Sequence, residues 1–260
     1  MITLTINGKQ AKAEAGEYLL AVLKRIGIEI PALCHHEAVE PYGGCRLCMV
    51  EITKKDWDGW KNHVTACLYA VEEGLIVNTH SEKVNELRKT LLDLYLARNP
   101  KTALIKELAA EYGLTKTSFK VVPEPDDCIL CAICTRVCDT MGFSAISTVS
   151  RGHGKEVAPP LHTAPPDCVG CLSCAQACPT GFIKFSQKGD KREIWGREFK
   201  MITCPESGQP TITEEFAEYL EKNRDIPADY FKSGDIADRR KLAETMGKIT
   251  NWSRAEVPGE

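Results

Sequence analysis

Two closely similar runs of cysteine lie in the second half of the chain. Residues 128–138 read CILCAICTRVC and residues 168–178 read CVGCLSCAQAC, so the spacing C-x2-C-x2-C-x3-C occurs twice. Pro179 follows the second run, whereas Asp139 follows the first. Two independent copies of a four-cysteine spacing rarely arise by chance, so the repeat indicates one kind of site built twice.

These thiols are suited to metal ligation rather than to disulfide bonding. The chain has 13 cysteines in 260 residues. An odd count and the close C-x2-C spacing argue against a disulfide framework, which a reducing cytosol would not maintain. Thiolates select zinc or iron–sulfur clusters. Paired zinc knuckles, the alternative, would use two plus two cysteines each and leave the middle cysteines unexplained.

The repeated spacing is that of bacterial ferredoxins, in which the fourth cysteine of each run binds the cluster of the other run. We therefore predict two [4Fe–4S] sites with crossed ligation. The first set is Cys128, Cys131, Cys134 and Cys178, and the second set is Cys138, Cys168, Cys171 and Cys174. Asp139 stands where the motif has proline, which leaves the ligands intact but is expected to alter the local turn.

A third set of cysteines lies near the N-terminus. Its members are Cys34, Cys45, Cys48 and Cys67, spaced C-x10-C-x2-C-x18-C. Four thiolates with a C-x2-C pair predict a [2Fe–2S] cluster, although the first gap is longer than in plant-type ferredoxins. Gly43 and Gly44 precede the pair and would let backbone amides approach the sulfides. Zinc is the alternative ligand for this set.

The elements around the N-terminal set predict a small α+β domain over residues 1–80. Strands at 2–6 and 10–15 flank Asn7-Gly8, a tight-turn signal, and a helix over 18–27 ends at glycine. The cysteine-bearing loop 34–48 precedes a strand at 49–53. Further strands are expected within HVTAC and GLIVNTH, after a hairpin tip at KKDWDGWKNH.

Helices and turns are expected to connect the cysteine sets. Ser81 can cap a helix that runs to about Arg98, and a second helix covers 102–113. We expect the apolar face of the first helix to comprise Val84, Leu87, Leu91, Leu94 and Tyr95. A hairpin within REIWGREFKMIT and a helix from Thr213 follow the second run. The last 35 residues suit either a partly ordered tail or a strap lying on a partner subunit.

Composition excludes several functions. A net charge of −3 gives no electrostatic argument for nucleic acid, and the longest apolar stretches are too short to span a bilayer. The N-terminus lacks the features of a signal peptide, so we expect a cytoplasmic protein. We find neither G-x-G-x-x-G nor G-x4-G-K-[ST], and therefore expect no flavin or nucleotide on this chain. Cys204, in TCPESG, is expected to be a buried structural thiol.

Both cysteine sets, their order and the linking helices make residues 1–205 similar to a known family. The chain resembles the ferredoxin-type subunit of soluble NAD-linked hydrogenases, the diaphorase small subunit. It equally resembles the N-terminal part of the largest peripheral subunit of bacterial NADH dehydrogenase, and the front end of [FeFe] hydrogenases. That family usually has a further cluster held by one histidine and three cysteines. Here Asn99 and Ala103 stand where the histidine and first cysteine would be, so we expect three clusters rather than four.

The resemblance implies an α+β fold in four parts. These are a β-grasp [2Fe–2S] ferredoxin-like domain (1–80), a helical linker (81–123), a bacterial-type two-[4Fe–4S] ferredoxin domain (124–203) and a C-terminal helix with an irregular, partner-binding arm (204–260). It also implies a non-catalytic electron-transfer subunit within a hetero-oligomer. One partner would be a flavoprotein subunit that binds NAD(P) and FMN. The other would be a low-potential catalytic subunit, such as a hydrogenase or formate dehydrogenase, in an assembly that could also be electron-bifurcating.

Three other functions fit the sequence less well. A free-standing ferredoxin carrier is compatible with the clusters, but the balanced charge and the C-terminal arm favour a fixed subunit. An iron–sulfur redox sensor would usually carry a DNA-binding or signalling module, and no such pattern is visible. A complete [FeFe] hydrogenase needs more cysteines beyond the two-[4Fe–4S] domain than Cys204 alone.

Overall fold

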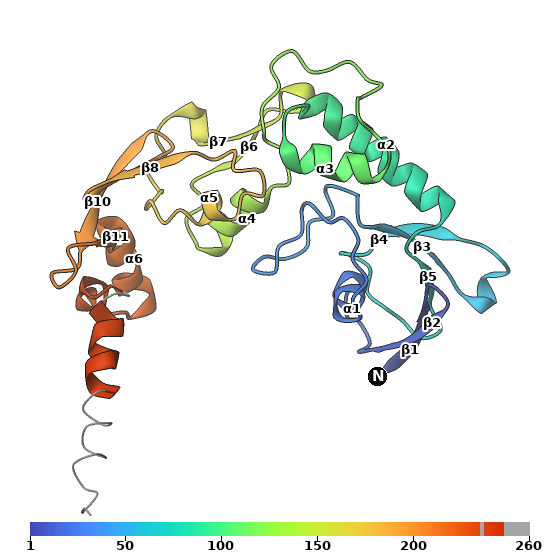
Figure 1. Cartoon of the computed structure of the whole chain (residues 1–260), viewed down its shortest axis with the longest axis horizontal. Coiled ribbons are helices and arrows are strands. Elements are labelled where there is room, and N and C mark those ends of the chain that lie inside the picture. Colours follow the sequence, from blue (N-terminus) through green and yellow to red (C-terminus); the bar gives the residue numbers. More distant parts are fainter. Residues whose placement is uncertain (235–236, 247–260) are drawn as a thin grey trace, which may run out of the picture. The chain divides into compact units, whose positions relative to one another are not determined.

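The computed structural model describes residues 1–234 and 237–246 (Figure 1). The chain divides into two compact units. The first comprises Met1–Gly142, Ile146–Ala158 and Cys174–Ile183, and the second comprises Phe143–Ala145, Pro159–Ser173 and Lys184–Glu260. The four domains expected from the sequence stay a prediction.

A five-stranded mixed sheet forms the N-terminal part of the first unit. Its strands are β1 (Ile2–Ile6), β2 (Lys9–Ala13), β3 (Met49–Thr53), β4 (Asn62–Thr65) and β5 (Ile76–Asn78), in the order β2-β1-β5-β3-β4. Strands β1 and β5 run parallel, and the other pairs are antiparallel. Asn7 and Gly8 both have positive φ, 48° and 80°, as the predicted tight β1–β2 turn requires.

One short helix buries its apolar side in the core of this sheet. Helix α1 (Leu19–Arg25) contributes Leu19, Leu20, Val22 and Leu23, each at most 2 % exposed. They pack in one cluster with sheet residues such as Leu4, Val50 and Val77. A 3-10 turn, η1 (Lys55–Trp57), lies in the β3–β4 connection, where the hairpin tip was predicted. The expected α+β fold of the [2Fe–2S] domain is confirmed.

Helix α2 (Glu82–Arg98) begins where the capping signal predicts, since the Ser81 hydroxyl accepts a hydrogen bond from the Val84 amide at 3.4 Å. Its predicted apolar face is wrong at Leu94, which is 47 % exposed. The buried stripe instead follows the i, i+4 rows from Val84 through Arg88 to Leu92 and Leu96. This stripe therefore includes a fully buried arginine.

Helix α3 (Ala103–Glu111) follows α2 and stops just before Gly113, which has φ 72°. The remaining first-unit elements are α4 (Ile133–Thr140), the two-stranded ribbon β6 (Ser147–Val149) and β7 (Glu156–Ala158), and a 3-10 turn η2 (Gly152–Gly154) between those strands. Helix α5 (Ser173–Gln176) begins one residue before Cys174, just as α4 begins one residue before Cys134. Equivalent local structure thus occurs at the same place in each cysteine run.

The second unit contains a four-stranded antiparallel sheet in the order β11-β10-β9-β8. Its strands are β8 (Phe185–Lys188), β9 (Lys191–Ile194), β10 (Arg197–Thr203) and β11 (Pro210–Thr213). The β9–β10 pair is the hairpin predicted within REIWGREFKMIT. Helix α6 (Glu214–Arg224) starts at Thr213, whose hydroxyl accepts from the Phe216 amide at 3.3 Å, as predicted. The described part of the unit also contains two 3-10 turns, η3 (Pro160–His162) and η4 (Ala228–Lys232), and a helical stretch over 237–246.

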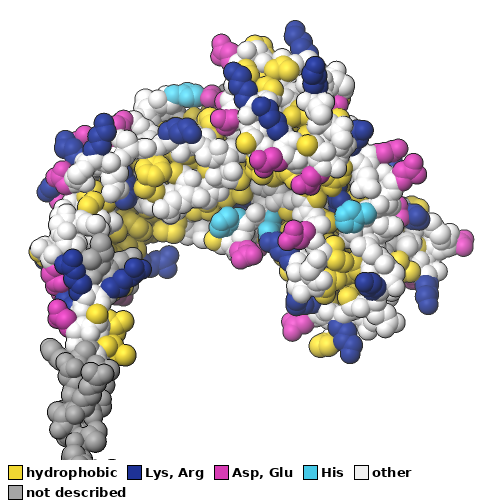
Figure 2. Space-filling view, viewed as in Figure 1, with side chains coloured by type: hydrophobic (Ala, Val, Ile, Leu, Met, Phe, Trp, Pro, Cys, Tyr) yellow, Lys and Arg dark blue, Asp and Glu magenta, His cyan; other side chains and the backbone are white. Residues whose placement is uncertain are grey.

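The C-terminal arm is expected to be either a partly ordered tail or a strap on a partner subunit. Part of it, residues 235–236 and 247–260, lies outside the described residues. Within the described part, no helix is both long and apolar enough to span a bilayer. Figure 2 shows Lys and Arg side chains interspersed with Asp and Glu over the face in view.

Candidate iron–sulfur sites

The four cysteines predicted to bind a [2Fe–2S] cluster come together in the first unit. All four are buried, at most 3 % exposed. The Cys48 and Cys67 sulfurs are 3.4 Å apart, and the Cys45 amide donates to the Cys34 sulfur at 3.4 Å. Thiols of the 34–48 loop and of the turn that follows β4 are thus neighbours in space.

Hydrogen bonding within this set shifts the pKa values of its thiols. A hydrogen bond from the Cys45 thiol lowers the pKa of Cys34 to about 6, against the opposing effect of burial. The same hydrogen bond, with burial, raises the pKa of Cys45. In the second pair, the Cys48–Cys67 hydrogen bond raises the pKa of Cys48 and lowers that of Cys67. The thiols of each pair therefore titrate together rather than singly.

Backbone amides of the glycine-containing loop point at these sulfurs. The Gly44 amide hydrogen-bonds Cys34, and the Gly43 amide hydrogen-bonds Cys67. Gly43 has φ 67°, and a Cβ at this residue would lie 2.3 Å from a methyl carbon of Leu68. Only glycine fits there without displacing its neighbour. The loop thus supplies hydrogen bonds to sulfur, which iron–sulfur sites use to set their potential.

The first predicted [4Fe–4S] set also lies wholly within the first unit. Burial raises the pKa of Cys128, of Cys131 to about 11 and of Cys134 to about 12. For Cys178, burial is outweighed by hydrogen bonds from the Thr180 hydroxyl and nearby amides, so its pKa is lowered. The charge of Cys178 also raises the pKa of Cys128 and of Cys131.

Each thiol of this set also accepts a hydrogen bond from the backbone. The Leu130 amide donates to Cys128, the Ile133 amide to Cys131 and the Thr135 amide to Cys134. Cys178 accepts from the amides of Thr180, Phe182 and Ile183. Thiolates held by amides in a dry environment are what a cluster ligand set requires. The residues present therefore fit a [4Fe–4S] cluster.

The backbone of the two cysteine runs repeats in detail. Leu130 and Ala132 in the first run have φ 51° and 55°, and Gly170 and Leu172 in the second run have φ 67° and 65°. The positive-φ residues occupy the same two places in each C-x2-C-x2-C. Three of the four are not glycine, so the conformation is imposed at a cost of order 1 kcal/mol each. The sequence repeat is therefore a repeat of conformation.

The two runs differ after their last cysteine, as the Asp139 substitution predicts. Helix α4 continues through Cys138 and Asp139 to Thr140. Helix α5 has already ended at Gln176, before Cys178 and Pro179. Proline lacks the amide hydrogen and cannot continue a helix, whereas aspartate can.

The second predicted [4Fe–4S] set is divided between the two units. Cys138 and Cys174 belong to the first, and Cys168 and Cys171 belong to the second. Within the second unit, the Arg197 guanidinium donates to the Cys168 carbonyl at 2.7 Å. Ligation by these four cysteines stays a prediction.

One apolar cluster contains thiols from both complete sets of the first unit. It includes Cys34 and Cys45 of the N-terminal set and Cys131 of the first [4Fe–4S] set, together with Leu92, Leu96 and Ile105 of helices α2 and α3. Tyr95 packs against the same cluster. Burial raises the pKa of Tyr95, and the charges of Cys45, Cys34 and Cys131 raise it further. The two sites are therefore neighbours in one dry core.

Arginines donate to backbone carbonyls of the cysteine loops, a feature that sequence reasoning missed. Arg88, fully buried, donates to the Leu47 carbonyl at 3.0 Å and the Met49 carbonyl at 2.8 Å. Arg98 donates to the Cys128 carbonyl at 3.4 Å. Because the loop amides are directed to sulfur, the loop carbonyls need other donors, and a guanidinium supplies five.

Arginines also donate to backbone carbonyls near the cysteines of the second unit. Besides its bond to Cys168, Arg197 donates to the carbonyls of Pro165 and Pro166 at 3.1 and 2.6 Å. Arg192 donates to the Gly170 carbonyl at 2.8 Å. Nothing local in the sequence reveals these partners, because they lie 22 to 32 positions away from the arginines.

Asn99, which stands where the related family has a histidine ligand, has a structural role here. It is fully buried, and its amide group donates to the carbonyls of Asp126 and Cys128 at 2.8 and 3.1 Å. Thr102 donates to the Asp127 carboxylate at 2.6 Å. These bonds hold the segment that leads into the first cysteine run.

Cys204 is buried, as expected for a structural thiol. Hydrogen bonds from the Ser207 hydroxyl and from surrounding amides lower its pKa to about 7. All thirteen cysteines are free thiols. Within the described part of the chain, no three Cys, His, Asp or Glu side chains converge closely enough to hold a single metal ion. Which metal centre the N-terminal set holds, a [2Fe–2S] cluster or the alternative zinc, stays a prediction.

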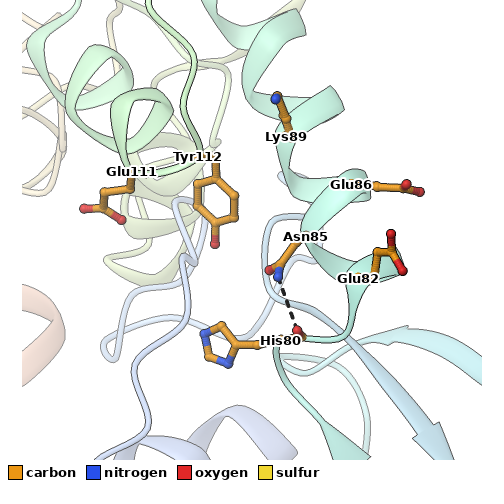
Figure 3. A pocket seen from close by; sticks show the side chains of 7 residues that line it. All are labelled: His80, Glu82, Asn85, Glu86, Lys89, Glu111 and Tyr112. Carbon is orange, nitrogen blue, oxygen red and sulfur yellow. Dashed lines mark hydrogen bonds between the residues drawn. The ribbon is translucent and has the colours of Figure 1, made fainter.

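A separate open pocket of 870 Å³ lies beside α2 and α3 (Figure 3). Its lining includes His80, Asn85, Glu86, Lys89 and Tyr112. The Asn85 amide donates to the His80 carbonyl at 3.2 Å, while Glu86 and Lys89 point away from the His80 ring. The polar groups do not converge, so this pocket is not arranged as an active site.

Comparison with known proteins identifies the two kinds of domain. Residues 1–82 match the family "2Fe-2S iron-sulfur cluster binding domain", and residues 165–184 match the family "4Fe-4S binding domain". With the fold and thiol sites above, these matches define an iron–sulfur protein that combines a [2Fe–2S] domain with ferredoxin-type [4Fe–4S] binding.

Similar proteins are subunits of larger oxidoreductases. The NADPH-Fe(3+) oxidoreductase subunit alpha of Geobacter sulfurreducens is 32 % identical in an alignment 229 positions long that covers 79 % of this chain and 26 % of that protein. A subunit of the NADH-quinone oxidoreductase of Rhizobium meliloti is 29 % identical in an alignment 178 positions long that covers 58 % of this chain and 20 % of that protein. The chain thus spans about a quarter or less of the length of these relatives.

One solved structure is matched over most of its own length. A chain of the NAD+-reducing [NiFe]-hydrogenase in the H2-reduced state has a TM-score of 0.60 and 25 % identity, covering 70 % of this chain and 86 % of that one. The resemblance predicted from the cysteine sets is confirmed. The chain is related to the iron–sulfur subunits of NADH-, NADPH- and hydrogenase-linked oxidoreductases.

Proposed function

We propose that this chain is the electron-relay subunit of a multi-subunit oxidoreductase. It would pass electrons between an NAD(P)- and FMN-binding flavoprotein subunit and a low-potential catalytic subunit, such as a hydrogenase or formate dehydrogenase. The observation that carries the proposal is the placement of two complete thiol sets beside one dry, apolar core. Iron–sulfur clusters held by such sets exchange single electrons at low potential.

The proposed cofactors are one [2Fe–2S] cluster and two [4Fe–4S] clusters. Cys34, Cys45, Cys48 and Cys67 would hold the [2Fe–2S] cluster. The first [4Fe–4S] cluster would be held by Cys128, Cys131, Cys134 and Cys178, and the second by Cys138, Cys168, Cys171 and Cys174. Backbone N–H···S hydrogen bonds at the first two sets and the repeated conformation of the two runs support this assignment.

The chain's own residues would bind the clusters, fix their positions and shield them from water. The sets share buried leucines and isoleucines that exclude water, which keeps the dielectric low around the charged sites. Loop amides and arginines fix the cysteines and compensate part of their negative charge. No acid–base pair or substrate pocket is apparent among the described residues, so the chemistry of substrates is assigned to partner subunits.

Metal analysis and spectroscopy test the proposal. After anaerobic reconstitution we expect about ten irons per chain, with one [2Fe–2S] signal and two magnetically coupled [4Fe–4S] signals in electron paramagnetic resonance (EPR) spectra. Zinc bound tightly at the N-terminal set would overturn the [2Fe–2S] assignment. Little iron or acid-labile sulfide in protein prepared without oxygen would refute the proposal as a whole.

The complex itself tests the fixed-subunit interpretation. In native extract we expect the chain to co-elute with a flavoprotein and a catalytic subunit, identified by mass spectrometry. A chain that elutes alone and still reduces several unrelated acceptors would instead be a free carrier.

A further inference from the structure

Arg136 connects the two complete thiol sets of the first unit. From helix α4 its guanidinium donates to the Cys34 carbonyl at 2.7 Å and to the Cys131 carbonyl at 3.4 Å. It also donates to the carbonyls of Glu40 at 2.6 Å and Ala132 at 3.1 Å. Cys34 belongs to the N-terminal set and Cys131 to the first [4Fe–4S] set. One side chain therefore bonds the backbone of a ligand from each site.

The surroundings of Arg136 hold it in this position. Its guanidinium carbon lies 5.3 Å from the centre of the Tyr42 ring, a cation–π arrangement. Every contact falls within the first unit. Arginine presents its donors in a rigid fork, so the four carbonyls, two from the N-terminal loop and two from the first cysteine run, fix one orientation.

The other first-unit arginines are not placed in this way. Arg88 contacts the N-terminal loop at Leu47 and Met49, and Arg98 contacts the first run at Cys128. Each serves one thiol set. The guanidinium of Arg136, by contrast, donates to a carbonyl in each set, at Cys34 and at Cys131.

We propose that Arg136 is a positioning residue for electron exchange between the [2Fe–2S] site and the first [4Fe–4S] site, fixing their separation and raising the reduction potential of both. The inference rests on the proposed function. One electron leaves one site and enters the other, so one is oxidised as the other is reduced, with no bond or proton change. The direct exchange also suits a chain in which Asn99 replaces the histidine of a further cluster.

The charge effect follows from electrostatics. Reduction adds one negative charge to a site that is already negative, and a fixed cation nearby stabilises the reduced form. Removing that cation from beside two sites should make both harder to reduce. A tenfold change in the equilibrium constant of a one-electron reduction corresponds to about 59 mV.

The test is an EPR-monitored redox titration of the reconstituted full chain. Arg136→Gln removes the charge. Arg136→Lys keeps the charge but loses the planar guanidinium and its fixed arrangement of hydrogen-bond donors. Arg98→Gln is the matched control, because it removes an equal charge that contacts the [4Fe–4S] side alone. Arg25→Gln controls for loss of surface charge, since Arg25 pairs with Glu17 at the surface of the N-terminal domain.

We expect Arg136→Gln to lower the reduction constant of both sites about tenfold, about 59 mV each, while iron content is unchanged. Arg98→Gln should lower the [4Fe–4S] potential only, and Arg25→Gln should change neither. Arg136→Lys should keep both potentials near wild type but weaken the magnetic interaction by which the reduced [4Fe–4S] site speeds relaxation of the [2Fe–2S] signal. If Arg136 had only a structural role, its substitution would change the iron content and would leave the two reduction potentials and the magnetic interaction unchanged.

Full iron content with an unshifted [2Fe–2S] potential in Arg136→Gln would overturn the inference. Should Arg136→Gln lose iron, Arg136→Lys decides: an unaltered magnetic interaction refutes the positioning role, and a weakened one supports it. Equal shifts in Arg98→Gln and Arg136→Gln at both sites would also refute it. A wild-type chain that binds no iron would refute the proposed function together with this inference, so the two failures are distinguishable.

Discussion

Arg88→Met is predicted to destabilise the [2Fe–2S] part of the first unit. Arg88 is fully buried and donates to the Leu47 and Met49 carbonyls, on either side of Cys48, and to the Tyr112 hydroxyl at 3.4 Å. Methionine keeps much of the apolar stem but supplies no donor. The variant therefore leaves two carbonyls next to a cluster ligand without their charged partner.

The expected loss is large compared with the stability of a domain. A hydrogen bond to a charged group contributes about 1.5–3 kcal/mol net, and Arg88 makes two short ones to the backbone. Relief of the desolvation cost of the buried guanidinium offsets part of this sum. We expect a net loss of about 3 kcal/mol, against a typical total of roughly 5–15 kcal/mol.

Urea titration of the anaerobically reconstituted full chain measures the effect, with cluster absorbance as the signal. At a slope of about 1–3 kcal/mol per molar urea, the midpoint should fall by roughly 1–3 M. Lys89→Met is the control, because Lys89 is the next residue of α2, is exposed and carries the same charge. A midpoint for Arg88→Met equal to that of the control would refute the role assigned to the buried guanidinium.

Three further predictions concern single residues. Gly43→Ala should weaken the [2Fe–2S] signal, because alanine is strained at φ 67° and would shift the Gly43 amide that hydrogen-bonds Cys67, whereas Gly59→Ala, with a similar positive φ in the β3–β4 connection, should keep it; an unchanged signal in both would contradict the proposed role of the loop. Cys45→Ser should abolish the [2Fe–2S] EPR signal and cut electron transfer between the partner subunits while each partner's own half-reaction continues; unchanged overall turnover would place this site off the main path. Asn99→Ala should lower the unfolding free energy by about 1–2 kcal/mol in urea titration, because the Asp126 carbonyl loses its bond from Asn99 and the Cys128 carbonyl keeps only the longer bond from Arg98; an unchanged midpoint would count against that role.

Local signals made much of the fold predictable. The hairpin at Asn7-Gly8, the capping of α2 at Ser81 and of α6 at Thr213, and the β9–β10 hairpin depend on residues close together in the sequence. The cysteine sets could be grouped for a different reason: ligand spacing is constrained by the geometry of the inorganic centre. In the structure the Cys48 and Cys67 sulfurs lie 3.4 Å apart, and ligation by the three sets stays a prediction.

Long-range polar contacts could not be predicted. The apolar face of α2 was misplaced at Leu94 because periodicity does not anticipate a buried arginine in the stripe, and Arg88 is buried only because its partners lie about 40 positions away. Arg136 and Cys34 are 102 positions apart. Such pairs satisfy carbonyls that irregular loops leave free, and only the folded chain shows where those carbonyls point.

The apolar core under the first-unit sites limits how this protein can be dissected. Leu33, Val39 and Leu47, before the predicted linker, are each at most 9 % exposed and pack with Leu92 and Ile105 of the helices that follow. A recombinant fragment ending at residue 80 would place those side chains in water, at roughly 1.5–3 kcal/mol each. Such a fragment would tend to aggregate, and a fusion or domain exchange that seeks the small ferredoxin module should therefore carry α2 and α3 with it.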